Sequence, residues 1–561
     1  MPSIFETDAA LDTLAATAIT QTKELMAQSE KLRDRREKAS RKRVARLFKD
    51  PKAIEATITL TDEVMRISSV QSSSRIFRRA AKKASLVGFG AVNALGLHFI
   101  GVLSRVVPGP IVGVVHQRVR ALSKDLILAS ESEKLAKHLA KRATKGISLN
   151  INVLGEAVLG DHEAEQRFQS ILEMMRRPEV NYISVKLSSI VAQLIIIDVD
   201  GSIDRVSEKM RILYRQAQEH GVFVNLDMEE YRDLPMTVAA FMRVLDEAEF
   251  AAMKAGIVLQ AYLPESHHFF GELVKWAKAR YEKSGGTIKV RLVKGANLAM
   301  ERAEAELHGW SAAPYRTKSD VDASYVRLVD AALRPEHAKA VRIGIASHNL
   351  FHMTWAIEVA KSRGVLEQID IEMLEGMANA EALAVTRAGH PVLLYAPVTR
   401  KDDFAAAVAY LVRRLDENTS DENYLKAAFD IAKNPAKFAD QEQRFLKSIA
   451  ERHTITTETL RHVEHGQLTG LTFQNEANAD PTEPRFIASV EKAIKKVRGI
   501  KDQEIPLVIN GKEIFTKEQE EGSDPSDNGK VWYHYSVGSA KDVDNAVATA
   551  KKAQEKWSSL T

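Results

Sequence analysis

Short apolar runs alternate with amphipathic helical stretches through the middle of the chain. Eight of these runs have strand character, and they cover residues 147–156, 182–188, 222–229, 256–263, 287–296, 341–349, 369–377 and 391–398. Eight strand–helix units of this size predict an α/β fold, a (βα)8 barrel. Nearly every run ends in a polar or charged residue, and a barrel gathers the C-terminal ends of its strands on one functional face. The pattern therefore predicts a pocket at those strand ends.

The segments before and after these runs have different patterns. Apolar residues at helical spacing predict a helical arm at the start, whereas an Asn510-Gly511 turn signal and a capping box from Ser539 to Asp542 predict another domain near the C-terminus. This last domain is expected to be incomplete. We predict a helical arm over 1–145, a barrel with C-terminal helices over 146–460, a linker over 461–502 and the start of a further domain over 503–561.

Composition limits the chemistry available to the chain. The 561 residues contain no cysteine, which excludes disulfides, thiolate metal sites and a cysteine nucleophile within this sequence. The net charge of +4 is small for the length, so no nucleic-acid partner is expected. A basic stretch with ten Lys or Arg over 31–49 is interpreted as a solvated helix face rather than a polyanion-binding arm. The absence of a secretory signal predicts a cytoplasmic protein.

One segment has the composition of a membrane span. Residues 86–104 carry no formal charge, but four glycines interrupt them and two prolines follow. We predict short packed helices here rather than a span. Peripheral contact of this segment with the inner face of the cytoplasmic membrane stays open.

Charged and hydrogen-bonding residues close the predicted strands. Those expected to converge on the pocket are Lys186, Asp227, Gln260, Arg291, Lys294, His348, Asn349 and Tyr395. Lys186 and Asp227 either form a structural pair or hold a small zwitterion. Arg291 and Lys294, followed by a glycine, are suited to a phosphate or an electron-rich ring.

The helix predicted after the eighth strand contains two adjacent arginines. Tyr410, Arg413, Arg414 and Glu417 fall on one face of this helix. Paired arginines bind a carboxylate with planar, bidentate hydrogen bonds, although arginines near a helix C-terminus also complement the helix dipole on a solvated surface. The position directly after the last strand favours carboxylate binding. The residues alone predict an enzyme that binds a small carboxylate beside a larger, phosphate-bearing ligand, and they leave its redox chemistry open.

No HExxH, Walker P-loop, GxSxG or strand-linked GxGxxG motif is present, so no metal site is expected. The motifs that do occur, in order, are LNINVLGEAVLGDHEA, ISVKLS, VNLDMEEYRD, VLQAYL, VRLVKGA, ASHN, LLYAPV and YLVRRLDEN. Together they resemble the proline dehydrogenase family, over roughly residues 50–450. The arm and DPKAIEATITLTDEV resemble the version found in bacterial bifunctional proteins, which join this enzyme to a Δ1-pyrroline-5-carboxylate dehydrogenase.

The resemblance implies an activity. Proline dehydrogenases are (βα)8 barrels with non-covalent FAD, and they oxidise L-proline to Δ1-pyrroline-5-carboxylate, the first step from proline to glutamate, with a membrane quinone as electron acceptor. By this resemblance Asp227 and Arg291 are catalytic. The substrate-binding residues would be Lys186, Leu374, Tyr395, Tyr410, Arg413 and Arg414, and the flavin-binding residues Leu226, Gln260, Arg291, Lys294, Gly295, Ala296, Ser347, His348, Asn349 and Glu417.

Two features depart from the family pattern, and other interpretations stay open. Asn297-Leu298 replaces the usual aromatic pair after VRLVKGA, and TSDENYLK follows Glu417-Asn418. The final sixty residues resemble the start of an aldehyde dehydrogenase domain, so we expect this chain to lack that second, NAD-dependent activity. The alternatives are another FAD barrel oxidoreductase with a different small carboxylate or folate substrate, and a non-catalytic scaffold. A homo-oligomer also stays open.

Overall fold

The structure is a computed structural model, and contacts divide it into two units, Met1–Asn478 and Ala479–Thr561. It describes residues 6–47, 50–67, 69–124, 126–155, 158, 160–400, 407, 410, 423–463, 477–499, 503–526 and 529–560.

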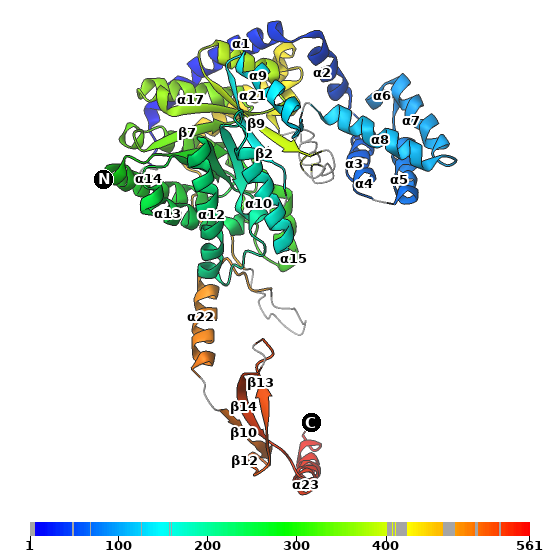
Figure 1. Ribbon diagram of the computed structural model, residues 1–561, viewed down its shortest axis with the longest axis vertical. Coiled ribbons are helices and arrows are strands. Elements are labelled where there is room, and N and C mark those ends of the chain that lie inside the picture. The colour runs from blue at the N-terminus through cyan, green and yellow to red at the C-terminus, as the bar shows by residue number, and fades with distance from the viewer. Residues whose placement is uncertain are drawn as a thin grey trace. The chain divides into compact units, whose positions relative to one another are not determined.

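Eight parallel strands close into a barrel within the first unit (Figure 1). Strand β9 pairs with both β2 and β8, which completes the ring, and a short β1 (Leu128–Ala129) also pairs with β9. The strands are β2 (Ile147–Val153), β3 (Tyr182–Lys186), β4 (Phe223–Asp227), β5 (Ala255–Gln260), β6 (Ile288–Val293), β7 (Val341–Ala346), β8 (Ile369–Leu374) and β9 (Val392–Thr399). Each lies within one residue of the run predicted for it, so the predicted barrel is confirmed.

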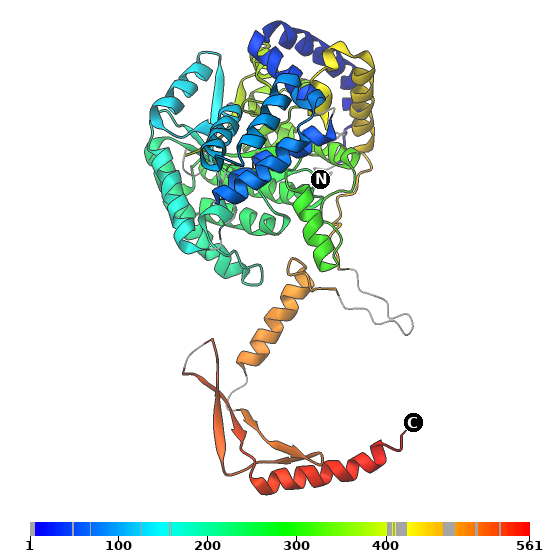
Figure 2. The same cartoon turned by 90° about the vertical axis from the view of Figure 1, so that its right-hand side faces the viewer.

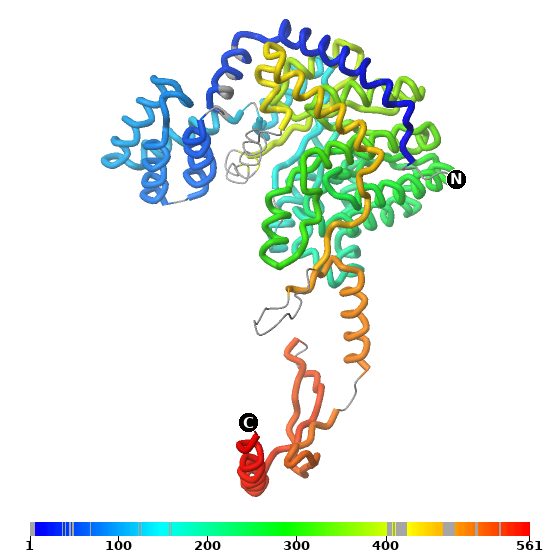
Figure 3. Tube along the Cα trace, turned by 180° about the vertical axis from the view of Figure 1, so that it is seen from behind, coloured from blue at the N-terminus to red at the C-terminus, as the bar shows by residue number. Residues whose placement is uncertain are grey.

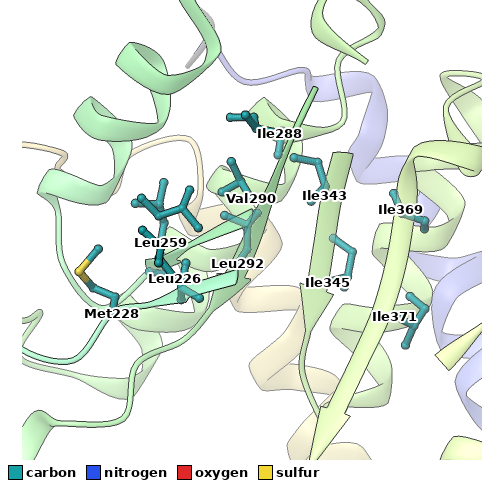
Figure 4. Close-up of a cluster of buried hydrophobic side chains, with 14 of the residues drawn as sticks. Leu226, Met228, Leu259, Ile288, Val290, Leu292, Ile343, Ile345, Ile369 and Ile371 are labelled. Atoms are coloured by element: carbon teal, nitrogen blue, oxygen red, sulfur yellow. The ribbon is translucent and has the colours of Figure 1, made fainter. Parts of the chain in front are cut away.

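Alternation along the strands separates an apolar layer from a polar barrel interior. Apolar residues of β6 and its neighbouring strands belong to the main hydrophobic core (Figure 4). The intervening residues of β6 are charged: Lys289 pairs with Glu372 on β8, and Arg291 pairs with Asp227 on β4. Each of these pairs skips one strand of the sheet order. Contacts that skip a strand form across the inside of a closed barrel, so its interior is polar here.

Helices with clear start and stop signals connect the strands. They are α10 (Asp161–Met175), α11 (Leu187–Ile190), α12 (Val199–His220), α13 (Leu234–Leu245), α14 (Glu265–Ser284), α15 (Leu298–His308), α16 (Lys318–Ala332), α17 (Leu350–Ser362) and α18 (Asn379–Arg387). Thr317 and Asp320 form a capping box at the start of α16. Gly221 and Gly285 adopt left-handed conformations that end α12 and α14.

The N-terminal helix α1 (Leu14–Leu32) runs along the barrel, packed on α17 and α18 (Figures 1 and 3). The C-terminal helix α21 (Pro435–Glu451) contacts α16, α17 and α1, and it follows the short α20 (Tyr424–Ala428). Phe445 of α21 stacks on Phe351 of α17. The fully buried Arg452 pairs with Asp12 before α1 and with Asp330 of α16. The chain's N-terminal arm is therefore held to the barrel by both apolar and ionic contacts.

The remaining arm helices follow α1. They are α2 (Arg35–Leu47), α3 (Pro51–Thr61), α4 (Glu63–Arg66), α5 (Val70–Lys83), α6 (Leu86–Phe89), α7 (Ala91–Leu103), α8 (Pro108–Ser123) and α9 (Ser132–Ala143). The uncharged residues 86–104 form α6 and α7, which confirms the prediction of short helices. Within the described part of the chain, no helix combines the length and the apolar character needed to cross a membrane.

The second unit contains short strands and two helices (Figure 2). Its elements are α22 (Pro484–Arg498), β10 (Gln503–Ile505), β11 (Leu507–Ile509), β12 (Lys512–Ile514), β13 (Gln519–Ser523), β14 (Val531–Ser536) and α23 (Ala540–Trp557). Asn510 and Gly511, both with positive φ, join β11 to β12 as the predicted hairpin turn. Ser539 and Asp542 form the predicted capping box of α23. Helix α22 lies inside the segment predicted as a linker.

Candidate active site

A cavity of about 360 Å³ lies at the C-terminal ends of the barrel strands. Its size falls in the range of small-molecule and cofactor sites. Thirteen of the residues predicted from the sequence line it: Lys186, Asp227, Gln260, Arg291, Lys294, Gly295, Ala296, Ser347, His348, Asn349, Leu374, Tyr395 and Tyr410. The barrel thus brings together residues that are spread over more than two hundred positions of the chain.

Asp227, Arg291 and Tyr395 form a buried cluster on one wall of the cavity. Arg291 donates to Asp227 Oδ1 at 2.5 Å, and the Tyr395 hydroxyl donates to Asp227 Oδ2 at 2.8 Å. The guanidinium also lies 5.0 Å from the centre of the Tyr395 ring. Burial raises the pKa of Tyr395 well above its usual value, and Asp227 adds to this effect. The tyrosine is therefore neutral and orients the carboxylate that it contacts.

The charge of Arg291 is fixed by its carboxylate neighbours. Burial alone would lower its pKa, but the attraction of Asp227 and Glu372 more than offsets this, so the pKa of Arg291 is raised. Glu372 Oε2 lies 3.6 Å from Arg291 Nη1, whereas the shorter contact with Asp227 is made by Arg291 Nη2. A permanent positive charge therefore faces the cavity, held between two carboxylates.

Lys186 is paired with a glutamate that also lines the cavity. Its ammonium lies 2.7 Å from Glu229 Oε1, and both side chains are largely buried. Glu229 follows Asp227 by two residues at the end of β4. Of the two interpretations of Lys186 and Asp227, the direct structural pair is not formed, because Asp227 binds Arg291 and Tyr395 instead. Their binding of a small zwitterion stays a prediction.

A second group of charges surrounds Asp322 of α16. Lys294, at 2.6 Å, and Lys318 both pair with this single carboxylate. Burial would raise the pKa of Asp322, yet the two ammonium groups hold it well below its usual range. Lys294 also donates to His352 Nδ1 at 2.9 Å, and burial together with Lys294 lowers the pKa of His352 well below its usual value. Burial lowers the pKa of Lys294 to about 7, although Asp322 opposes the shift. Near neutral pH, Lys318 and the protonated share of Lys294 therefore outweigh the single carboxylate, and this positive charge suits a phosphate.

A glutamine and a glycine complete this wall. Gln260 donates to the carbonyl oxygens of Met228 and Glu229 at 3.2 and 3.3 Å, and its buried Oε1 has no hydrogen-bond partner among the described residues. Gly295 has φ +132°, and a Cβ added there would collide with the ring of Tyr262. Glycine is therefore required at this position, and the chain can approach a ligand closely.

Other predicted residues have local structural roles or lie elsewhere. His348 Nε2 accepts from the Leu374 backbone at 3.1 Å, so it fixes the end of β8. Asn349 caps α17 through Phe351 N. Leu226 is fully buried in the hydrophobic core and is not among the cavity-lining residues, because its neighbour Asp227 takes the interior face. The predicted Arg413, Arg414 and Glu417 lie outside the described residues.

Several cavity residues were missed from the sequence, namely Glu229, Lys318, Asp322, His352, Glu372 and Arg444. Glu372 could have been found from the sequence. Asp370, Glu372 and Leu374 occupy every second position of β8 and so share one face of the strand, as Lys289 and Arg291 do on β6. Asn297 and Leu298, which depart from the family pattern, also line the cavity, and Asn297 contacts the Glu229 carbonyl at 3.4 Å.

Comparisons with known proteins agree with this architecture. A chain from Corynebacterium freiburgense Proline Utilization A is 43% identical with a TM-score of 0.59, over 70% of this chain and 38% of that one. The Proline Utilization A of Bdellovibrio bacteriovorus inactivated by N-propargylglycine shares the fold, with a TM-score of 0.77 at 23% identity, over 98% of this chain and 55% of that one.

A curated relative, 1-pyrroline-5-carboxylate dehydrogenase of Staphylococcus saprophyticus, is 38% identical over 87 residues, or 16% of this chain and 17% of its own length. The chain thus spans at most 55% of the length of any of these three proteins. A sequence profile described as Proline dehydrogenase matches residues 135–427, just over half of the chain and all eight barrel strands. On that match, the chain belongs to the proline dehydrogenase family.

Proposed function

We propose that the chain oxidises L-proline to Δ1-pyrroline-5-carboxylate with FAD as cofactor, and that a quinone accepts the electrons. This is the first step of the conversion of proline to glutamate. The observation that supports the proposal best is the buried Asp227–Arg291–Tyr395 cluster beside Lys186, in the strand-end cavity of a chain of this family. The cluster combines fixed charges with a small, partly apolar space, as a compact zwitterionic substrate requires.

The residues present fit a flavin dinucleotide. Lys294 and Lys318 supply the excess positive charge that a diphosphate needs, and the unpartnered Oε1 of Gln260 would accept from the N–H of a flavin ring. Gly295 permits close approach of the backbone. When bound, FAD supplies the hydride acceptor of the reaction.

The protein's own groups would bind and orient proline. Oxidation removes a hydride from the ring carbon next to nitrogen and a proton from the amine. Lys186, with the predicted Arg413 and Arg414, would bind the substrate carboxylate and so fix the direction of that ring carbon. Leu374 and Tyr410 would form apolar walls of the proline pocket. The arrangement accelerates the reaction by positioning.

Arg291 and Tyr395 would tune the charge of the site. The fixed positive charge of Arg291 would stabilise negative charge that develops next to it, because a preorganised donor in a water-poor site costs little reorganisation. Tyr395 would hold Asp227 in the orientation that keeps Arg291 in place, and its ring would leave little room for a substituent on the proline ring.

The direct test is an anaerobic visible spectrum of the purified chain reconstituted with FAD, before and after L-proline is added. We expect flavin bands that bleach with proline, with a large loss of rate in Tyr395→Phe and none in Tyr281→Phe, a tyrosine at the barrel surface. Flavin bands that persist at saturating proline would refute the proposed substrate. A protein that stays colourless with added FAD would refute the cofactor.

We also propose that the arm touches the membrane that holds the quinone. From Val64 to Lys124 the sequence has ten Lys or Arg and no Asp or Glu. Val92 and Phe99 of α7 are 87% and 70% exposed, and Arg75, Arg79 and Lys82 are exposed along one face of α5. Exposed apolar side chains next to a basic surface favour binding to anionic lipid.

Co-sedimentation with phosphatidylglycerol vesicles tests this surface. The double substitution Val92→Gln and Phe99→Gln should weaken binding roughly tenfold or more, since each side chain loses about 1 kcal/mol or more of apolar burial. Leu307→Gln, which changes an exposed leucine on α15, is the matched control. Equal binding of all three proteins, or equal binding to uncharged vesicles, would refute the membrane contact.

A further inference from the structure

A row of alternating charges runs through the barrel interior behind Arg291. Glu372 Oε1 lies 2.6 Å from the Lys289 ammonium, which lies 2.9 Å from Asp370. Asp370 in turn binds Arg342 at 2.5 and 2.7 Å. Lys289 and Glu372 are each only 2% exposed, whereas Arg342 reaches solvent. A chain of ion pairs therefore connects the cavity wall to the barrel surface.

This row replaces what usually fills a barrel. The interiors of such barrels are packed mostly with branched apolar side chains, and a buried ion pair gives little or no net stability over an apolar pair of similar size. Gly344 of β7 makes room for the row, because a Cβ there would collide with the Glu372 carboxylate and lie 3.1 Å from Lys289 Cε. Stability alone does not explain a buried lysine and glutamate at this depth.

The geometry indicates a different role. Each terminal nitrogen of Arg291 has one carboxylate neighbour, Asp227 at 2.5 Å from Nη2 and Glu372 at 3.6 Å from Nη1. Burial would lower the pKa of Lys289, but Glu372 and its other neighbours raise it above the usual value, so it is charged. A charged Lys289 balances the negative charge of Glu372 from the far side. Without it, Glu372 would hold an uncompensated negative charge and would compete with Asp227 for the guanidinium.

We propose that Glu372 and Lys289 are positioning residues for Arg291, which rests on the proposed function of the cavity. Glu372 supports the second side of the guanidinium, and Lys289 balances Glu372 so that Asp227 keeps the closer contact. Neither residue needs to touch the substrate. The pair sets where the positive charge of Arg291 lies in the cavity.

The test is a charge-rescue series made in the full chain, with proline-dependent reduction as the first readout. Lys289→Met leaves Glu372 unbalanced, so Arg291 moves toward it, and kcat/KM should fall about tenfold or more, mainly in kcat. Adding Glu372→Gln removes the competing charge, and the double variant should recover to within about threefold of the unmodified chain. Arg342→Met, which removes a cation that does not contact Glu372, is the matched control and should change kcat/KM less than about threefold.

A second readout does not depend on catalysis. The loss of urea resistance caused by Asp227→Asn reports how strongly Arg291 relies on Asp227. That loss should shrink in the Lys289→Met background and return when Glu372→Gln is added. A double variant no more active than Lys289→Met, together with an equal Asp227→Asn loss in all backgrounds, would overturn the positioning role. If the unmodified chain is not reduced by proline, the proposed function fails, and the urea series still decides the positioning of Arg291.

Discussion

Asp233 gives the chain a pH-dependent stability whose sign and size follow from its surroundings. It ends the short helix η2 (Tyr231–Asp233) after β4 and is largely buried. Burial, with a further contribution from Glu230, raises the pKa of Asp233 from 3.8 to about 7, although Arg232 opposes the shift. In the unfolded chain the carboxyl ionises near its usual value. Between these two values the folded state holds a proton that the unfolded state has lost, so folding stability falls as pH rises toward 7.

The size of this change in stability follows from the raised pKa of Asp233. Over the roughly two pH units from pH 5 to pH 7, the folded state holds about one more proton than the unfolded state. At 1.36 kcal/mol per pH unit, this difference in proton binding corresponds to about 3 kcal/mol of stability. Asp233→Asn removes this term. The free energy of unfolding of the unmodified chain should therefore fall by about 3 kcal/mol more than that of the variant between pH 5 and pH 8.

Urea unfolding of both proteins at pH 5 and pH 8 measures this difference. Packing changes caused by the asparagine are the same at both pH values. Comparing the pH-dependent change in unfolding free energy of the two proteins therefore isolates the titration of Asp233. Asp200→Asn, at an exposed position of α12, is the control and should follow the unmodified chain. An Asp233→Asn effect that is equal at pH 5 and pH 8 would show that Asp233 ionises normally, and would refute the reasoning.

Three further predictions concern single contacts. Tyr395→Phe removes a hydrogen bond to the Asp227 carboxylate, worth about 1.5–3 kcal/mol, so proline-dependent flavin reduction should slow roughly 10- to 100-fold; an unchanged rate would remove the hydroxyl from the mechanism. Gly295→Ala forces a Cβ against the Tyr262 ring, and the ratio of flavin to protein absorbance should fall sharply while the fold, followed by circular dichroism, persists. Arg452→Met removes donors to Asp12 and to the Asp8 carbonyl, while Asp330 keeps its ion pair with Arg363, so the free energy of unfolding in urea should fall by about 1.5–3 kcal/mol, and a loss below about 0.5 kcal/mol would contradict this.

The barrel could be predicted from the sequence because its signal is local. Each strand is a short apolar run with a polar end, and the observed strands lie within one residue of the predicted runs. The position of Lys186, Arg291 and Tyr395 around one cavity follows from barrel geometry alone. Their identity as flavin or proline ligands came from resemblance to a family and stays a prediction.

The pairing of charges within the site could not be predicted in the same way. Lys186 pairs with Glu229 rather than Asp227, and Arg291 takes the aspartate, because side chains from β3, β4 and β6 meet only after the sheet closes. Partner choice depends on distances across the barrel, which no local pattern encodes. Leu226 is different: alternation along β4 already places it on the face opposite Asp227, so the sequence could have excluded it from the cavity.

The charge balance of the described cavity limits where a substrate carboxylate can bind. Lys186 is paired with Glu229 and Arg291 with Asp227, so these two cations alone bring no net positive charge to an incoming carboxylate. The excess of cations lies around Asp322, the place that suits a diphosphate. A small carboxylate near Tyr395 therefore needs positive charge from another element. We expect Arg413 and Arg414, which lie outside the described residues, to supply that charge, and the assignment of these two arginines therefore matters more for the proposed substrate binding than that of Lys186.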